Sequence, residues 1–257
     1  MVGFAQAQDV KGPVARSLGG AGLSIANPWS VFNNQATMAQ IEHFGAGVST
    51  ARMYNIDQLS QTAIGLVIPI QKAGTIGISY SNAGVRSLYS VKEMGLSLAR
   101  SFGDVFSMGL ELTTRNLFIE NYGNQWLLTP ELGILLKPEE GITLAAHISN
   151  PFGTFISEPI NERFPTIVRF GGSYFINDNI NVLAEVSAYS TQKSKFHGGL
   201  LYRLNSKISL STGFQTRDFS SSFGLQLALS KVRIHLALSY HQKLGSSPEF
   251  GLQYGTL

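Results

Sequence analysis

From about residue 43 to its end, the chain alternates apolar residues with small or polar ones, in runs of roughly ten residues. Thr75–Tyr80 and Val232–Tyr240 are clear examples. Successive side chains of a strand point to opposite faces of a sheet, so this period of two predicts β-strands. Strands of soluble proteins usually run about five or six residues. Strands of about ten residues with one apolar face are instead typical of a transmembrane β-barrel.

The alternating pattern divides into fourteen strand candidates joined by connections of two kinds. The candidates are roughly 43–52, 58–70, 73–82, 88–101, 105–118, 126–137, 141–149, 165–176, 180–189, 194–204, 207–216, 219–229, 231–241 and 248–255. Tight links such as 71–72 and 177–179 alternate with longer ones such as 119–125 and 150–164. Outer-membrane barrels have short periplasmic turns, longer extracellular loops and an even strand number. We therefore expect an all-β, antiparallel barrel over residues 43–257, in a bacterial outer membrane, with both termini periplasmic. The alternative is a soluble β-sandwich or barrel.

Composition excludes several other classes of protein. Only 14% of the residues are charged, which suits a chain whose outer face meets lipid. The net charge is +3 without a cluster of Lys or Arg, so nucleic acid is not an expected partner. No apolar run approaches the roughly twenty residues of a transmembrane helix. No Gly-x-Ser-x-Gly elbow or phosphate loop occurs, and we expect no enzymatic activity and no cofactor.

The register opposite the apolar face holds small residues and nearly all the mid-strand charge. This face is expected to line the lumen, and its charged members are Glu93, Glu111, Arg115, Glu131, Arg169, Glu185, Arg203 and Arg233, together with His147, His197 and His235. Balanced charges in a confined lumen are expected to pair, because an unpaired buried charge is costly. Three interpretations remain: a structural network that braces the N-terminal segment, the lining of a polar pore, or a metal or catalytic site. The histidines lack ligand-type spacing, so no metal site is expected.

The N-terminal region departs from the strand pattern. Residues 1–7 end in a small-x-small pattern, with Ala5 and Ala7, that is typical of a signal-peptide cleavage site. The alternative is an ordinary terminus. Residues 8–42 are glycine-rich and then include a candidate short helix over 31–40, with Ser30 as a possible N-cap. We expect this segment to lie inside the barrel as a plug; the alternative is a loose periplasmic tail.

The same segment resembles the opening of the long-chain fatty-acid transporter (FadL) superfamily. The resemblance rests on Ala15–Ala26 followed by Ser30–Ala36, and further matches are 149–153, 165–171 and 239–254. Its closest likeness is to short PorV-like outer-membrane proteins of Bacteroidetes, where PorV is a barrel of the type IX secretion system. The residues that match the plug motif are Arg16, Gly19, Gly20, Gly22, Asn34, Gln35 and Ala36. Gln35 stands where the superfamily usually has proline, and the chain is shorter than the fatty-acid transporters.

Two functions follow from this resemblance. One is a PorV-like accessory subunit that binds partners in an envelope export or assembly system. The other is a FadL-type passive transporter of small hydrophobic molecules. The charged inner face favours the first function, because paired charges would fill the space that an acyl chain needs. The expected partners are outer-membrane lipid and other envelope proteins, with a small hydrophobic ligand as the alternative.

Overall fold

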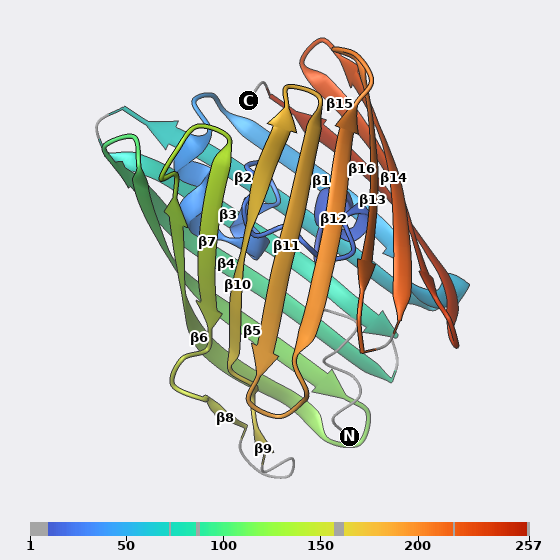
Figure 1. The fold of residues 1–257 in the computed structure, drawn as a ribbon. Coiled ribbons are helices and arrows are strands. Elements are labelled where there is room, and N and C mark those ends of the chain that lie inside the picture. Colours follow the sequence, from blue (N-terminus) through green and yellow to red (C-terminus); the bar gives the residue numbers. More distant parts are fainter. Residues whose placement is uncertain (1–9, 72, 86–87, 157–161, 218, 256–257) are drawn as a thin grey trace.

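The computed structural model describes residues 10–71, 73–85, 88–156, 162–217 and 219–255. The chain forms a closed antiparallel barrel of fourteen strands, with short helices near its N-terminus (Figure 1). The predicted fold class is therefore confirmed. No helix among these residues is both long and apolar enough to cross a bilayer. The expected signal-peptide remnant, residues 1–7, lies outside the described residues.

Each barrel strand pairs with its neighbours along the chain, and β1 pairs with β16 to close the ring. The barrel strands are β1 (Gly45–Arg52), β2 (Leu59–Ile70), β3 (Gly74–Val85), β4 (Tyr89–Phe102), β5 (Phe106–Ile119), β6 (Gly123–Leu136), β7 (Ile142–Ser149), β10 (Ile167–Asn177), β11 (Ile180–Tyr189), β12 (Lys195–Arg203), β13 (Ile208–Gln215), β14 (Ser220–Leu229), β15 (Val232–His241) and β16 (Gly245–Tyr254). The last strand starts earlier than the sequence pattern predicts. Strands β8 (Phe155–Ile156) and β9 (Glu162–Arg163) form a separate pair between β7 and β10, within the longer link 150–164, for which no strand was predicted.

Alternation along each strand separates an outer apolar face from the lumen. In β5, Leu110 and Leu112 are about half exposed, whereas the alternate residues Glu111 and Thr113 are buried. The outer face of β16 follows the same pattern, with Phe250, Leu252 and Tyr254 exposed. A continuous apolar surface of this kind is costly in water, and in a membrane barrel it is the surface that meets lipid.

The N-terminal segment lies inside the barrel, where it appears in blue among the strands (Figure 1). It contains helix α1 (Pro13–Ser17), helix α2 (Ser30–Asn33) and the 3₁₀ helix η2 (Gln35–Gln40). A further 3₁₀ turn, η3 (Met53–Asn55), follows β1. We call residues 10–41 the plug. Helices this short are not stable alone in water, so the plug depends on its packing against the wall.

The plug differs in detail from the single helix predicted over residues 31–40. Asn34 adopts an extended conformation and breaks that stretch in two, with its side chain accepting a hydrogen bond from the backbone N–H of Ala36. Ser30 is not an N-cap: its hydroxyl accepts from Asn27 N–H at 3.0 Å and donates to the carbonyl of Ile25 at 3.2 Å. The hydroxyl therefore closes the turn before α2 and leaves the helix without a side-chain cap.

Three apolar clusters attach the plug to the wall. Val31, Met38 and Ile41 pack with Val67 and Ala99. The other two clusters join Leu23 and Ala36 to Leu135 and Ala145, and Leu18 and Ala21 to Leu183. Burying a large aliphatic side chain contributes about 1.5–3 kcal/mol. These wall residues therefore stabilise the plug in its place.

Candidate binding cavity in the barrel lumen

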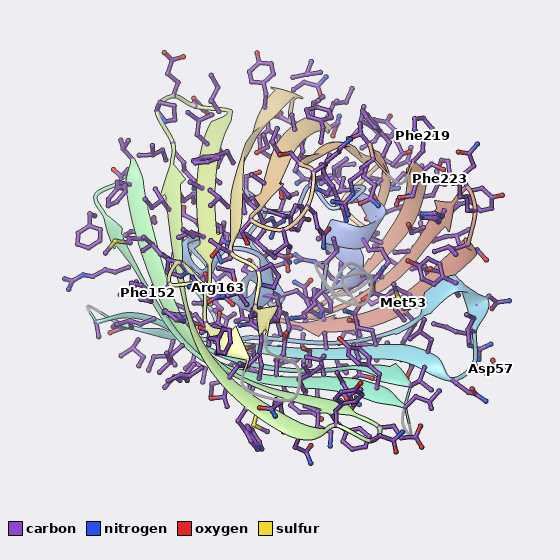
Figure 2. All side chains as sticks on the ribbon, turned by 90° about the horizontal axis from the view of Figure 1, so that it is seen from below. Met53, Asp57, Phe152, Arg163, Phe219 and Phe223 are labelled. Carbon is purple, nitrogen blue, oxygen red and sulfur yellow. The ribbon has the colours of Figure 1, made fainter. Side chains whose placement is uncertain are left out.

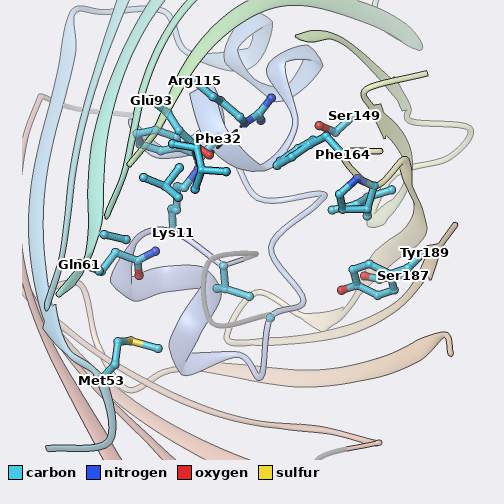
Figure 3. A pocket seen from close by; sticks show the side chains of 18 of the residues that line it. Lys11, Phe32, Met53, Gln61, Glu93, Arg115, Ser149, Phe164, Ser187 and Tyr189 are labelled. Carbon is cyan, nitrogen blue, oxygen red and sulfur yellow. Dashed lines mark hydrogen bonds and ion pairs between the residues drawn. The ribbon is translucent and has the colours of Figure 1, made fainter. Parts of the chain in front are cut away.

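A cavity of about 950 Å³ occupies the lumen between the plug and the longer loops (Figure 3). The plug contributes Val31 and Phe32, and the loop between β7 and β10 contributes Phe164. Strand residues complete its largely apolar wall: Leu59, Ala83, Val85, Val91, Leu117, Ile119, Leu127 and Ile167. Concave, mostly apolar spaces with a few polar groups are the usual form of small-molecule sites.

A charged cluster lies on the β4–β6 side of this cavity, with Arg115 at its centre. The Arg115 guanidinium donates from Nε to Glu93 at 3.0 Å and from Nη2 to Glu131 at 2.7 Å. Lys11 of the plug forms an ion pair with Glu93, and Nε2 of His147 lies 3.2 Å from Glu131. These side chains come from neighbouring strands because cross-strand partners on one face are about 5 Å apart.

Glu111 connects this cluster to the plug. Its carboxyl group accepts hydrogen bonds from the Gln35 side-chain amide, from Ser79 at 3.0 Å and from Thr113 at 3.2 Å. Gln35 Nε2 also reaches Glu131 at 3.4 Å. A proline at position 35 has no side-chain amide and could not make these bonds, so this attachment of the plug depends on Gln35.

A second cluster, on the adjacent strands β10–β12, holds the backbone of the plug. Arg169 donates from Nε to Glu185 at 2.6 Å and from Nη1 to the carbonyl of Asn33 at 3.2 Å. Glu185 accepts from the backbone N–H of Leu23 at 3.3 Å. Nδ1 of His197 lies 2.8 Å from the carbonyl oxygen of Gly19. Since a carbonyl can only accept, Nδ1 carries the proton in this contact.

The remaining plug residues predicted from the motif also touch the wall or each other. Arg16 forms an ion pair with Glu249 and donates to Gln61 at 2.6 Å. Asn34 donates to the carbonyls of Leu23 at 3.0 Å and Ile134 at 3.1 Å. Ala36 is fully buried, Gly19 and Gly20 adopt positive φ angles, and a side chain at Gly22 would overlap Ala15.

Two predicted members of the charge network are not part of it. Arg203 and Arg233 lie at the ends of β12 and β15, beside the short turns, rather than in mid-strand. Within the described part of the chain, neither forms an ion pair. The expected mid-strand placement is wrong for both, because Arg203 is the last residue of β12 and Arg233 is the second residue of β15.

The expectation that paired charges would fill the lumen is also wrong. Charges of the Arg115 cluster lie against the wall and around the plug, and they leave the cavity of about 950 Å³ beside them. Among the described residues, no group of three or more His, Cys, Asp or Glu side chains could hold a metal ion. Sequence reasoning missed Lys11, Gln61 and Phe164, which lie in irregular segments or carry no charge.

Comparisons with known proteins identify the fold. No protein-family model and no curated protein matches the chain. Among solved structures, the toluene transporter TbuX of Ralstonia pickettii has a TM-score of 0.71 at 15% identity, covering 97% of this chain and 99% of its own. The Pseudomonas putida toluene transporter TodX has a TM-score of 0.69 at 11% identity, covering 95% and 97%. A Pseudomonas aeruginosa FadL homologue has a TM-score of 0.65 at 13% identity, covering 95% and 98%. At these identities the likeness establishes the fold.

Proposed function

We propose that this chain is an outer-membrane channel of the FadL superfamily that admits small hydrophobic molecules into its lumen. The observation that supports this most strongly is the apolar cavity of about 950 Å³ between the plug and the longer loops. A polar pore would have a hydrated lining along its length, whereas most of the surface that lines this cavity is apolar, including Val31 and Phe32 of the plug beside Lys11. Two of the structurally similar barrels are described as toluene transporters, which agrees with this ligand class.

The proposed orientation places the short turns in the periplasm and the longer loops outside. Tyr254, at the end of β16, pairs with Val232 beside the turn between β14 and β15. The described end of the chain therefore belongs to the short-turn side, in agreement with a periplasmic C-terminus. A molecule entering from outside meets the cavity first and the plug second. We propose that the plug extends over residues 8–42.

Uptake by proteoliposomes tests this function. A cavity-filling substitution, Ala83→Trp, is compared with Ala184→Trp, because Ala83 lines the cavity and Ala184 faces outward on β11. Native protein and Ala184→Trp are expected to take up a small aromatic hydrocarbon faster than protein-free vesicles, and Ala83→Trp to lose most of that rate. Equal uptake by the two variants would refute transport through this cavity.

A second candidate function is the PorV-like accessory role in an envelope export or assembly system. It is supported by exposed aromatic side chains at the rim of the long-loop end, where Phe152 is 82% and Phe219 is 68% exposed (Figure 2). Exposed aromatic residues are common at protein interfaces. Recovery of the same envelope proteins with the native chain, and their loss with Phe152→Ser, would favour this role. If no envelope protein is recovered with the native chain, the accessory role is refuted.

A further inference from the structure

Arg115 has one guanidinium nitrogen without a partner. Its Nε and Nη2 atoms are bound to Glu93 and Glu131, but Nη1 is buried and makes no hydrogen bond. The residue is only 6% exposed and lines the cavity. An unsatisfied buried donor on a charged group is costly, so an acceptor that reaches Nη1 would bind favourably.

Two apolar side chains that line the cavity lie beside the Arg115 guanidinium. The ring of Phe164 lies 5.1 Å from the guanidinium carbon, and Leu127 is the cross-strand neighbour of Arg115 (Figure 3). The backbone of Phe164 is fixed, because its N–H donates to Thr154 at 2.8 Å and its carbonyl accepts from Asn150 at 2.8 Å. Its side chain lies over the guanidinium, so rotation about the side-chain bonds would change the access to Nη1 from the cavity.

The charge balance of the cluster indicates which kind of acceptor fits. Around the Arg115 guanidinium itself, three carboxyl groups, those of Glu93, Glu111 and Glu131, surround two permanent cations, those of Lys11 and Arg115. The other Lys and Arg residues of the cavity lining come from other strands and loops: Arg163, Arg169, Lys195 and Lys243. A free carboxylate entering the Arg115 cluster would be repelled, because the negative charge of the three carboxyl groups already equals or exceeds the charge of the two cations. A neutral oxygen accepts the same hydrogen bond without that repulsion.

We propose that the cavity selects neutral aromatic molecules that carry a hydrogen-bond-acceptor oxygen, such as aryl ketones or esters. The aromatic ring lies against Phe164 and Leu127, and the oxygen accepts from Nη1 of Arg115. This inference rests on the proposed function, because it names the class of molecule that the cavity admits.

Three probes of similar size test this preference with the native chain in lipid nanodiscs: ethylbenzene, acetophenone and benzoate. Affinities are measured by ligand-observed NMR, with protein-free nanodiscs as the blank. We expect acetophenone to bind about tenfold more tightly than ethylbenzene, and benzoate to bind least tightly of the three. The infrared carbonyl band of bound acetophenone is expected to shift to lower frequency, which reports the hydrogen bond without a variant.

Arg115→Lys keeps the positive charge and removes the forked donor, so it is expected to bring acetophenone and ethylbenzene to similar affinity. Arg52→Lys is the matched control, because Arg52 pairs with Asp57 outside the cavity. The control is expected to keep the tenfold preference. A preference that survives in Arg115→Lys would overturn the assignment to Arg115.

The outcomes separate this inference from the proposed function. Equal binding of ethylbenzene and acetophenone to the native chain, or an unshifted carbonyl band, would overturn the inference and leave the channel function standing. Tightest binding of benzoate would overturn the preference for neutral molecules. Binding of none of the three probes would overturn the inference and count against the cavity as a ligand site.

Discussion

Glycines of the inner register mark the places where the plug touches the wall. A side chain at Gly213 would overlap the backbone of Leu18, and one at Gly109 would overlap the backbone of Gln35 and Ala36. Glycine is permitted here because the two backbones approach closely. Gly45, at the start of β1, has more room: the nearest atom to a side chain there is in the Pro28 ring, at 3.4 Å.

Gly213→Ala is therefore expected to destabilise the protein by about 1–3 kcal/mol, because the extra methyl group forces the plug away from β13. Gly45→Ala serves as the control, since its methyl group meets only ordinary contacts, and it should change stability by less than about 0.5 kcal/mol. Urea unfolding in lipid vesicles, followed by tryptophan fluorescence, measures both. Equal stability of the two variants would contradict the close contact between the plug and β13.

At the scale of the element, the two faces of strand β5 lie in different environments. The alternation in β5 places Leu110 toward the outside, where it is 52% exposed, and Gly109 against the plug. Shifting the register of such a strand by one residue would exchange its two faces. The apolar outer face therefore fixes which side chains can contact the plug.

Leu110→Arg is expected to lower the free energy of unfolding in bilayers by about 2–4 kcal/mol, the cost of an arginine on the lipid face near the midplane. Gly109→Arg points inward, so it should displace η2 from the wall without that lipid cost. Kinetics of folding into vesicles and protease sensitivity of the plug distinguish the two effects. If Leu110→Arg folds as stably as the native chain, the assigned outer face is wrong.

In the segment between β7 and β10, the Asn150 side chain joins the two ends of the loop. Asn150 is fully buried at a φ of 54°, and its side chain donates to Phe164 at 2.8 Å and accepts from Thr154 N–H at 3.0 Å. Asparagine tolerates this left-handed conformation better than most residues. The segment contributes Arg163, Phe164 and Pro165 to the cavity.

Asn150→Ala should loosen this segment, because it removes these hydrogen bonds and strains the backbone. We expect trypsin to cleave at least tenfold faster after Arg163 than in the native chain. Asn205→Ala is the control: Asn205 caps a short turn at the opposite end by accepting from Lys207 and Ile208. Cleavage after Arg163 at the native rate would show that other contacts hold the segment.

At the scale of the whole molecule, closure of the barrel around the plug decides whether the plug stays in place. Arg16 is buried and forms an ion pair with Glu249, which is 233 residues away in the sequence. Removing one partner of a buried pair is costly because the other charge stays buried. The plug is therefore expected to remain in place while the barrel is folded.

Limited proteolysis of the folded barrel measures this directly. Trypsin is expected to cut after exposed Lys243, in the loop between β15 and β16, at least a hundredfold faster than after Arg16. Protein unfolded in urea should show comparable cleavage at both sites. Rapid cleavage after Arg16 in an otherwise intact barrel would instead support the tail interpretation of the N-terminal segment.

Much of the fold and part of the candidate site could be predicted from local pattern. Strand number followed from a period of two that each strand displays independently. The inward direction of Glu93, Arg115 and Glu131 followed from the same alternation. The break at Asn34 could not be predicted, because its hydrogen bonds to Leu23 and Ile134 exist only once the plug is enclosed.

By itself, the sequence determined which side chains face outward and which face the lumen, because alternation is a property of each strand and needs no distant contact. Only the tertiary structure decided which charges meet and where the lumen stays open. Arg203 and Arg233 share the inner register with Arg115, yet no carboxylate pairs with them in the described chain. Pairing and cavity depend on barrel closure and on the course of the plug, which bring together groups as distant as Arg16 and Glu249.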